Sequence, residues 1–175
     1  MRYTLVQRSM WSAFTLDIVE GSGRVVGEIR SPNLFQYKNA RMAFHPPGST
    51  AGNVKFKFQG VAYEVWVEVL RRAFINDVRY TLQKDQKVLA SVDIIFKRGE
   101  RFPAVLLRTP VQGSFRRTGS PWSRHFELHS DSKLLATVFH PHWITLRVHL
   151  AVEIAADQPV LPLVFAAYVI KEILY

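Results

Sequence analysis

The feature that most constrains the fold is an apolar run near the C-terminus, from Pro159 to Ile170. Pro159 and Pro162 fit only the first turn of a helix, where amide hydrogens lack intrahelical partners, and no helix breaker follows them. Asp157, just upstream, is a candidate N-cap. We therefore predict a helix over about residues 159–174, although the β-branched residues in the run leave a final strand open.

This predicted helix is apolar on every side as far as Lys171 and Glu172. A helix without a polar face is normally buried all round. At 1.5 Å per residue it spans only about 20 Å, which is too short to cross a bilayer, so we expect no transmembrane segment. We expect it to form part of the protein core, through Leu163, Val164, Phe165, Ala167, Tyr168 and Ile170.

Elsewhere apolar residues recur with a period of two, which is typical of β-strands. β-branched and aromatic residues fill these segments, and turn residues separate them at the spacing of about 8–12 residues found in sandwiches and barrels. We expect about ten to twelve strands. The candidate segments are residues 3–8, 14–18, 24–29, 40–45, 54–58, 63–69, 78–82, 88–96, 104–109, 111–116, 125–129, 133–139 and 144–154.

The two patterns together predict the fold class: mainly β (α+β by content), a closed antiparallel barrel of about twelve strands around a hydrophobic C-terminal helix. A barrel of this size has a lumen that something must fill, and the helix suits that role. No shift in composition divides the chain, so we expect a single domain over residues 1–175. Residues 14–29 and 126–139 both read as strand, polar turn, strand, which hints at an internal repeat.

The order of features in the chain resembles a known group. A long alternating segment (Ile144 to Ile154), then Asp157 and Pro159, then a hydrophobic terminal helix, is similar to the tubby C-terminal-like superfamily. That superfamily includes the LURP-one-related proteins and the phospholipid scramblases. An early strand containing Asp17, a glycine turn and Val25-Val26-Gly27 resemble the opening hairpin of the LURP-one-related group, and the likeness covers nearly the whole chain.

The resemblance implies a twelve-stranded barrel around a central helix, and a bias toward binding lipids or partners. The sequence also departs from the group. Scramblases carry a cysteine-rich palmitoylation stretch and a calcium-binding loop, and this chain has no cysteine and no acidic loop. Tubby proteins bind phosphoinositides through a basic pocket, and no motif here matches those residues one by one.

The charge balance favours anionic partners. The chain has 23 Lys and Arg against 14 Asp and Glu, a net charge of +9 and a pI of about 10.1. Nucleic acid, an acidic membrane surface and an acidic protein all fit, and so does a basic surface that serves only solubility. Having no cysteine excludes a disulfide framework, a thiolate metal site and a cysteine nucleophile. The N-terminus lacks a signal-peptide core, so we expect a cytoplasmic protein, peripheral to the membrane.

No motif indicates catalysis. The stretch Gly21 to Gly27 superficially resembles a dinucleotide-binding loop, but a strand follows it rather than a helix. His125 and His129 lie about 13 Å apart along one strand, too far to chelate a metal directly. We therefore expect no enzymatic activity, no catalytic or cofactor-binding residues, no metal site and no cofactor.

Basic residues cluster in two stretches that we take as candidate anion- or lipid-binding residues. The first contains Lys97, Arg98 and Arg101, and the second contains Arg116, Arg117, Trp122 and Arg124. Cations beside an aromatic residue suit a lipid headgroup, and they also suit stacking on single-stranded nucleic acid. The alternative is that these arginines cap strands and the tryptophan packs on its neighbours.

The function expected from the sequence is a non-enzymatic binding module that meets an anionic phospholipid surface or a protein partner through its basic loops. The alternative is a barrel that binds nucleic acid or a small ligand, which ranks lower. The sequence does not indicate an oligomeric state.

Overall fold

The computed structural model of the chain describes residues 1–9, 15–31, 46–73, 75–97, 99–100, 102–119, 124–141 and 148–174. Within these residues it defines twelve strands and one helix. The strands are β1 (Arg2–Gln7), β2 (Thr15–Glu20), β3 (Val25–Arg30), β4 (Thr50–Phe58), β5 (Val61–Arg71), β6 (Asp77–Lys84), β7 (Lys87–Ile95), β8 (Ala104–Thr109), β9 (Gly113–Thr118), β10 (His125–Ser130), β11 (Lys133–Phe139) and β12 (His149–Ile154). The helix, α2, spans Val160–Leu174.

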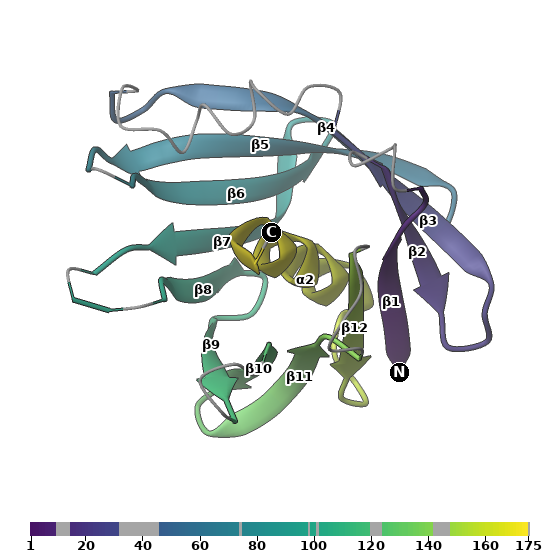
Figure 1. The fold of residues 1–175 in the computed structure, drawn as a ribbon. Coiled ribbons are helices and arrows are strands. Elements are labelled where there is room, and N and C mark those ends of the chain that lie inside the picture. The colour runs from purple at the N-terminus through teal and green to yellow at the C-terminus, as the bar shows by residue number, and fades with distance from the viewer. Residues whose placement is uncertain are drawn as a thin grey trace.

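The strands form one closed antiparallel barrel (Figure 1). Strands that are adjacent in sequence pair with each other, and the ring closes where β1 pairs with β12, with Leu5 opposite Leu150. Side chains alternate between the interior and the outer wall: Val65 and Val67 of β5 are fully buried, whereas Trp66 between them is 37% exposed. The predicted fold class is therefore confirmed.

The helix α2 runs through the interior of the barrel (Figure 1). It lies against β6, β7, β8 and β12, and the Phe56 ring of β4 meets the rings of Phe165 and Tyr168 edge to face. The segment Val160–Leu174 is an α-helix, so the alternative of a final strand is wrong, and every residue from Pro162 to Ile170 is buried. A helix with no polar face is stable here because apolar side chains surround it. The six predicted core residues are at most 2% exposed: Leu163, Val164, Phe165, Ala167, Tyr168 and Ile170.

Three hairpins share one irregularity at the same place. In β2–β3, β6–β7 and β10–β11, the strand entering the hairpin pairs normally until shortly before the turn, where the partner strand contributes one extra residue. The extra residues are Val26, Leu89 and Leu135. Such bulges increase the local twist, which a closed barrel needs. The internal repeat suspected at residues 14–29 and 126–139 thus has a third structural counterpart at β6–β7, and the three hairpins recur every fourth strand.

Some local expectations need correction. Asp157 is not the N-cap: it adopts a left-handed φ of 67° in the turn before the helix, which begins at Val160. The strand expected at residues 111–116 is β9, which begins and ends two residues later because Pro110, Val111 and Gln112 form the turn from β8. Of the strand expected at residues 144–154, the structure describes His149–Ile154 as β12. The segment 40–45 lies outside the described residues.

Candidate basic surface at the loop end of the barrel

The connections at the two ends of the barrel differ in length. In an antiparallel barrel, successive connections alternate between the two ends. At one end, called here the turn end, they are short: 21–24, 59–60, 85–86, 110–112, 131–132 and, leading into the helix, 155–159. At the other end, called here the loop end, they are mostly longer: 8–14, 31–49, 72–76, 96–103, 119–124 and 140–148. Long loops on a rigid scaffold are common places for binding sites.

The sequences at the loop end carry most of the excess positive charge. They contain nine of the 23 Lys and Arg and only one acidic residue, Glu100. The cations are Arg8, Lys38, Arg41, Arg72, Lys97, Arg98, Arg101, Arg124 and Arg147. They also contain three of the four tryptophans, at positions 11, 122 and 143. The turn-end sequences contain one cation, Arg24, and three acids, Asp85, Asp131 and Asp157. The connections at one end of the fold therefore carry most of the basic and tryptophan-containing sequence, and of these residues the structure describes Arg8, Arg72, Lys97 and Arg124.

Of the two predicted basic stretches, the structure describes Lys97 and Arg124 in connections at this loop end. Lys97 follows β7 and its Nζ lies 3.8 Å from Glu100 Oε1, with both side chains more than half exposed. Arg124 is exposed immediately before β10, and its carbonyl accepts a hydrogen bond from the backbone N–H of His140. Three other predicted residues, Arg98, Arg101 and Trp122, lie outside the described residues.

Arg116 and Arg117 belong to strand β9 and point to opposite faces of the sheet. Arg117 is on the same, inward-facing side of β9 as Phe115. Its guanidinium lies 3.9 Å from the centre of the Phe102 ring, a cation–π contact. Arg116 is exposed on the outer wall, opposite Glu127 of β10. The two arginines predicted as one cluster are therefore divided by the pleat of the strand.

A carboxylate lies between two imidazoles on the outer face of β10. Glu127 Oε2 lies 3.0 Å from His129 Nε2, and Glu127 Oε1 lies 3.8 Å from His125 Nε2. His125 also stacks on the Phe139 ring of β11. The glutamate between the two histidines thus lies close to both. The described residues contain no group of three or more His, Asp or Glu placed to hold a metal ion.

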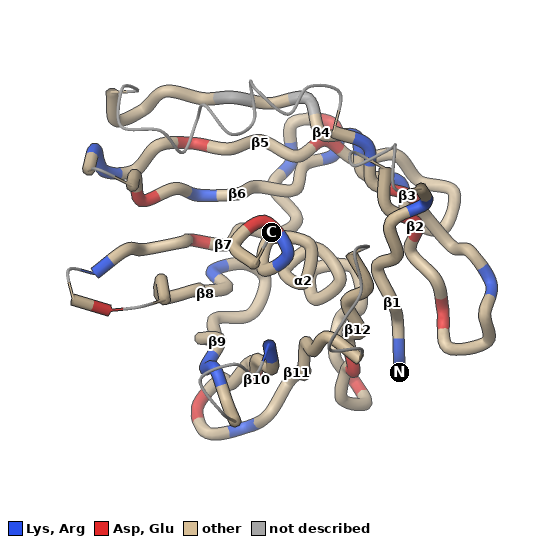
Figure 2. Tube along the Cα trace, viewed as in Figure 1, with Lys and Arg blue, Asp and Glu red and all other residues tan. Residues whose placement is uncertain are grey.

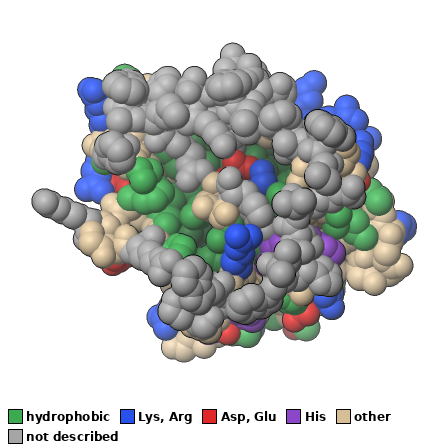
Figure 3. Space-filling view, viewed as in Figure 1, with side chains coloured by type: hydrophobic (Ala, Val, Ile, Leu, Met, Phe, Trp, Pro, Cys, Tyr) green, Lys and Arg blue, Asp and Glu red, His purple; other side chains and the backbone are tan. Residues whose placement is uncertain are grey.

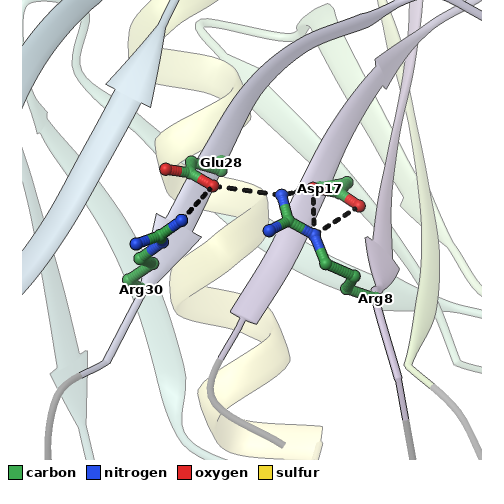
Figure 4. Close-up of polar contacts among 4 residues, drawn as sticks. All are labelled: Arg8, Asp17, Glu28 and Arg30. Atoms are coloured by element: carbon green, nitrogen blue, oxygen red, sulfur yellow. Dashed lines mark hydrogen bonds and ion pairs between the residues drawn. The ribbon is translucent and has the colours of Figure 1, made fainter. Parts of the chain in front are cut away.

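Along the strands, Lys and Arg positions lie among Asp and Glu positions (Figure 2). Acids pair with several of these cations, and also with Arg8 in the connection after β1. Arg8 bridges Asp17 of β2 and Glu28 of β3, and Glu28 also accepts a hydrogen bond from Arg30 (Figure 4). The bonds to Asp17 and Glu28 raise the pKa of the Arg8 guanidinium. Asp17 and Glu28 face each other across the strands, so the arginines offset a repulsion. This network fits a structural role.

Asp93 on β7 forms a second network of this kind. Its side chain is 2% exposed beneath two arginines: Arg79 Nε donates to one carboxylate oxygen at 2.7 Å and Arg108 Nε to the other at 2.9 Å. The hydrogen bonds to Asp93 raise the pKa of Arg79. These bonds tie β6, β7 and β8 together on the outside of the barrel.

The outer wall also carries a groove that sequence reasoning missed. It has a volume of about 390 Å³ and crosses β3 to β6. Its charged lining residues are Arg30, Lys55, Lys57, Lys84, Glu28, Glu64 and Asp85. Three acids among four cations leave little net charge, so the groove attracts an anion less than the loop end does. Only the strand register brings these residues together, so no sequence motif marked the groove.

The fold defines a class: a twelve-stranded antiparallel barrel closed around its own C-terminal helix. No described helix has the length and apolar character needed to cross a bilayer. Comparisons of the chain with protein-family models, with curated proteins and with solved structures found no match. The resemblance to the tubby C-terminal-like superfamily accordingly stays a prediction.

Proposed function

We propose that the protein is a non-enzymatic module that binds an anionic phospholipid surface through the loop end of its barrel, as a peripheral protein on the cytoplasmic side of a membrane. The observation that carries the proposal is the concentration of basic and tryptophan-containing sequence in the connections at that end, with Glu100 the single acid among them. Each cation near an anionic bilayer contributes about 1 kcal/mol of binding free energy, so several together support stable association.

The combination of residue types favours lipid over the alternatives. Tryptophan and cations together are typical of the membrane–water interface, where the indole lies among headgroups and the cations meet phosphate. Single-stranded nucleic acid would use the same residue types for stacking and charge neutralisation, and it is the second candidate. The resemblance to the LURP-one-related and tubby-like group, a separate prediction, favours lipid as well.

The interior of the barrel does not favour a small-molecule ligand. Barrels that carry such ligands hold them in an open lumen. Here α2 fills the interior. Its residues from Pro162 to Ile170 are all buried, and Phe165 and Tyr168 lie against Phe56 of strand β4. A surface-binding role fits this architecture better than a carrier role.

Vesicle co-sedimentation tests the proposal. We expect binding to vesicles of phosphatidylcholine with phosphatidylglycerol, no binding to phosphatidylcholine alone, and a loss of binding as salt rises above about 0.1 M. The paired variant Lys97→Gln/Arg124→Gln removes two loop-end charges and should weaken binding by about thirtyfold. The matched control, Lys87→Gln/Lys133→Gln, removes two exposed charges at the turn end and should bind as the parent protein does.

A further variant, Lys55→Gln/Lys57→Gln, tests the groove as the competing surface. Loss of binding in that variant or in the turn-end control, with the loop-end variant unaffected, would overturn the assignment to the loop end. Equal binding to neutral and anionic vesicles would remove the lipid proposal. Tight binding to a single-stranded oligonucleotide without vesicle binding would favour the nucleic-acid alternative.

A further inference from the structure

The groove across β3 to β6 has a chemistry that the proposed function does not use. The interior of the barrel is occupied by α2, and hydrophobic side chains gather in the middle of the face drawn in Figure 3. The outer wall is instead hollowed where β5 presents Ala62, its smallest outward side chain, opposite Lys57 of β4. This hollow of about 390 Å³ has room for a molecule of metabolite size.

Two lysines of the groove are available to a ligand. Lys55 and Lys57, called here the lysine pair, lie two residues apart on β4, so both exposed side chains leave the same face of the sheet. Neither forms an ion pair or a hydrogen bond within the part of the chain that the structure describes. Glu28 faces Lys57 across the β3–β4 ladder, but its carboxylate already accepts hydrogen bonds from Arg8 and Arg30 (Figure 4).

An indole ring lies flat on the wall beside the lysine pair. Glu64, which faces Lys55 from β5, accepts a hydrogen bond from Trp66 Nε1 at 3.2 Å. A Cβ on Gly52 would lie 2.5, 2.7 and 2.8 Å from three atoms of the six-membered ring of Trp66, so this ring turns one face to the backbone of β4. Trp66 is 37% exposed, and its other face is turned toward solvent. The indole is therefore a fixed aromatic platform.

These groups together define the chemistry of a matching ligand. Lysine ammonium groups form charge-assisted hydrogen bonds with a carboxylate. The side-chain oxygens of Glu64, Gln83 and Asp85, which also line the groove, accept hydrogen bonds from hydroxyl groups. The face of an indole is electronegative and attracts the C–H groups of a flat aliphatic ring. A phosphate dianion suits the groove less, because the carboxylates repel its second charge.

We propose that the groove binds an acidic saccharide, a short sugar chain that contains uronic acid. The carboxylate of one sugar unit lies between Lys55 and Lys57, and a neighbouring sugar ring stacks on Trp66. Glu64 lies between these two contacts, since it faces Lys55 and bonds to Trp66, so it accepts hydrogen bonds from the hydroxyl groups of the chain. This site is separate from the loop end, and the inference goes beyond the proposed function.

Isothermal titration calorimetry of the full-length protein with trigalacturonic acid, at about pH 7, tests the inference. We expect saturable binding with a dissociation constant below about 1 mM. Lys55→Gln/Lys57→Gln should weaken this binding by about tenfold or more, because it removes the partners of the carboxylate. Lys87→Gln/Lys133→Gln, which removes two exposed charges outside the groove, is the matched control and should bind as the parent protein does.

Two single variants test the rest of the site. Trp66→Leu keeps an apolar side chain over Gly52 but removes the aromatic face, so the affinity should fall by about fivefold. Glu64→Gln, at an exposed position, leaves the core untouched and should also weaken binding, because a charged acceptor is lost. Parent-like affinity in both variants would overturn the placement of the sugar chain along β5.

Three further ligands distinguish the proposal from its competitors. Maltotriose, a neutral chain of the same number of sugar rings, should bind far more weakly, and equal affinity would overturn the role of the lysine pair. Tighter binding of uridine monophosphate or of inorganic phosphate than of trigalacturonic acid would overturn the saccharide as the ligand. Absence of trigalacturonic acid binding would overturn the inference and leave the proposed function, which vesicle binding tests separately.

Discussion

The ring of Phe165, on the central helix, meets the ring of Phe56, on strand β4, edge to face, with centroids 6.2 Å apart and planes at 75°. Both side chains are fully buried. The contact joins the last element of the chain to the wall of the barrel. It follows that the strands cannot complete their core without the helix, because its side chains occupy the space that the inward-facing residues would otherwise leave empty.

Replacing Phe165 with alanine is expected to destabilise the protein by about 3–5 kcal/mol, because it removes an aromatic side chain from a core that cannot collapse around the gap. Chemical denaturation followed by circular dichroism measures the change. Ending the chain at Ala156 removes the whole helix and should leave a product without a cooperative unfolding transition. A truncated protein that melts cooperatively near the temperature of the full chain would contradict the central role of the helix.

Two glycines on the barrel wall should respond differently to alanine. A Cβ at Gly27 would overlap the backbone carbonyl oxygen of Lys57, which cannot move, whereas one at Gly52 would come within 2.5 Å of the Trp66 ring. We expect Gly27→Ala to cost about 3 kcal/mol and Gly52→Ala about 1 kcal/mol, since the half-exposed indole can rotate away. Gly21→Ala, whose Cβ meets only ordinary contacts at 3.5 Å, is the control. Denaturant midpoints in any other order would show that the close approach to Lys57 is not rigid.

Removing the charge of Asp93 should lower the stability of the protein, because this one carboxylate links strands β6, β7 and β8. Asp93→Asn keeps the shape of the side chain but weakens its hydrogen bonds from Arg79 and Arg108, so we expect a loss of about 1–3 kcal/mol in the free energy of unfolding. The arginines are partly exposed and can regain water, which limits the loss. Asp85→Asn, in an exposed turn, should change stability by less than about 0.5 kcal/mol. Urea denaturation of both variants checks this, and equal effects would contradict the structural role of Asp93.

Alkaline pH should destabilise the protein in part through Tyr3. Burial of the Tyr3 hydroxyl raises its pKa above 10.0, and nearby Glu20 adds to the shift while Arg24 opposes it. The folded state therefore holds this proton more tightly than the unfolded state. Stability is unaffected below about pH 10, and it falls as pH rises from there through the raised folded-state value.

The matched variant is Tyr3→Phe, which keeps the ring against Phe58 and lacks the ionisable group. Its melting temperature should fall less than that of the parent protein between about pH 9 and 11, while the two proteins differ little in pH dependence near neutrality. Parallel curves over the alkaline range would show that Tyr3 does not contribute.

The sequence by itself determined that the chain is built from strands and one apolar helix, and that this helix fills the interior of the barrel. Strict alternation, as in Val65, Trp66 and Val67, identified strands, and a segment with no polar side, around Phe165, identified a helix that had to be enclosed. Both signals are local, since they depend on the spacing of side chains along one segment. The boundaries were less well determined: Val111 continues the alternation of β9, so the pattern could not show that it belongs to a turn.

Only the tertiary structure decided which residues meet across strands and at which end each connection emerges. Arg116 and Arg117 are neighbours in sequence, yet the pleat places one on the outer wall and the other over the Phe102 ring. Glu127 links two histidines and faces Arg116 only through the register of β9 and β10. The reason is physical: the closure of twelve strands fixes register and the alternation of ends, and those depend on pairings between residues far apart in the chain.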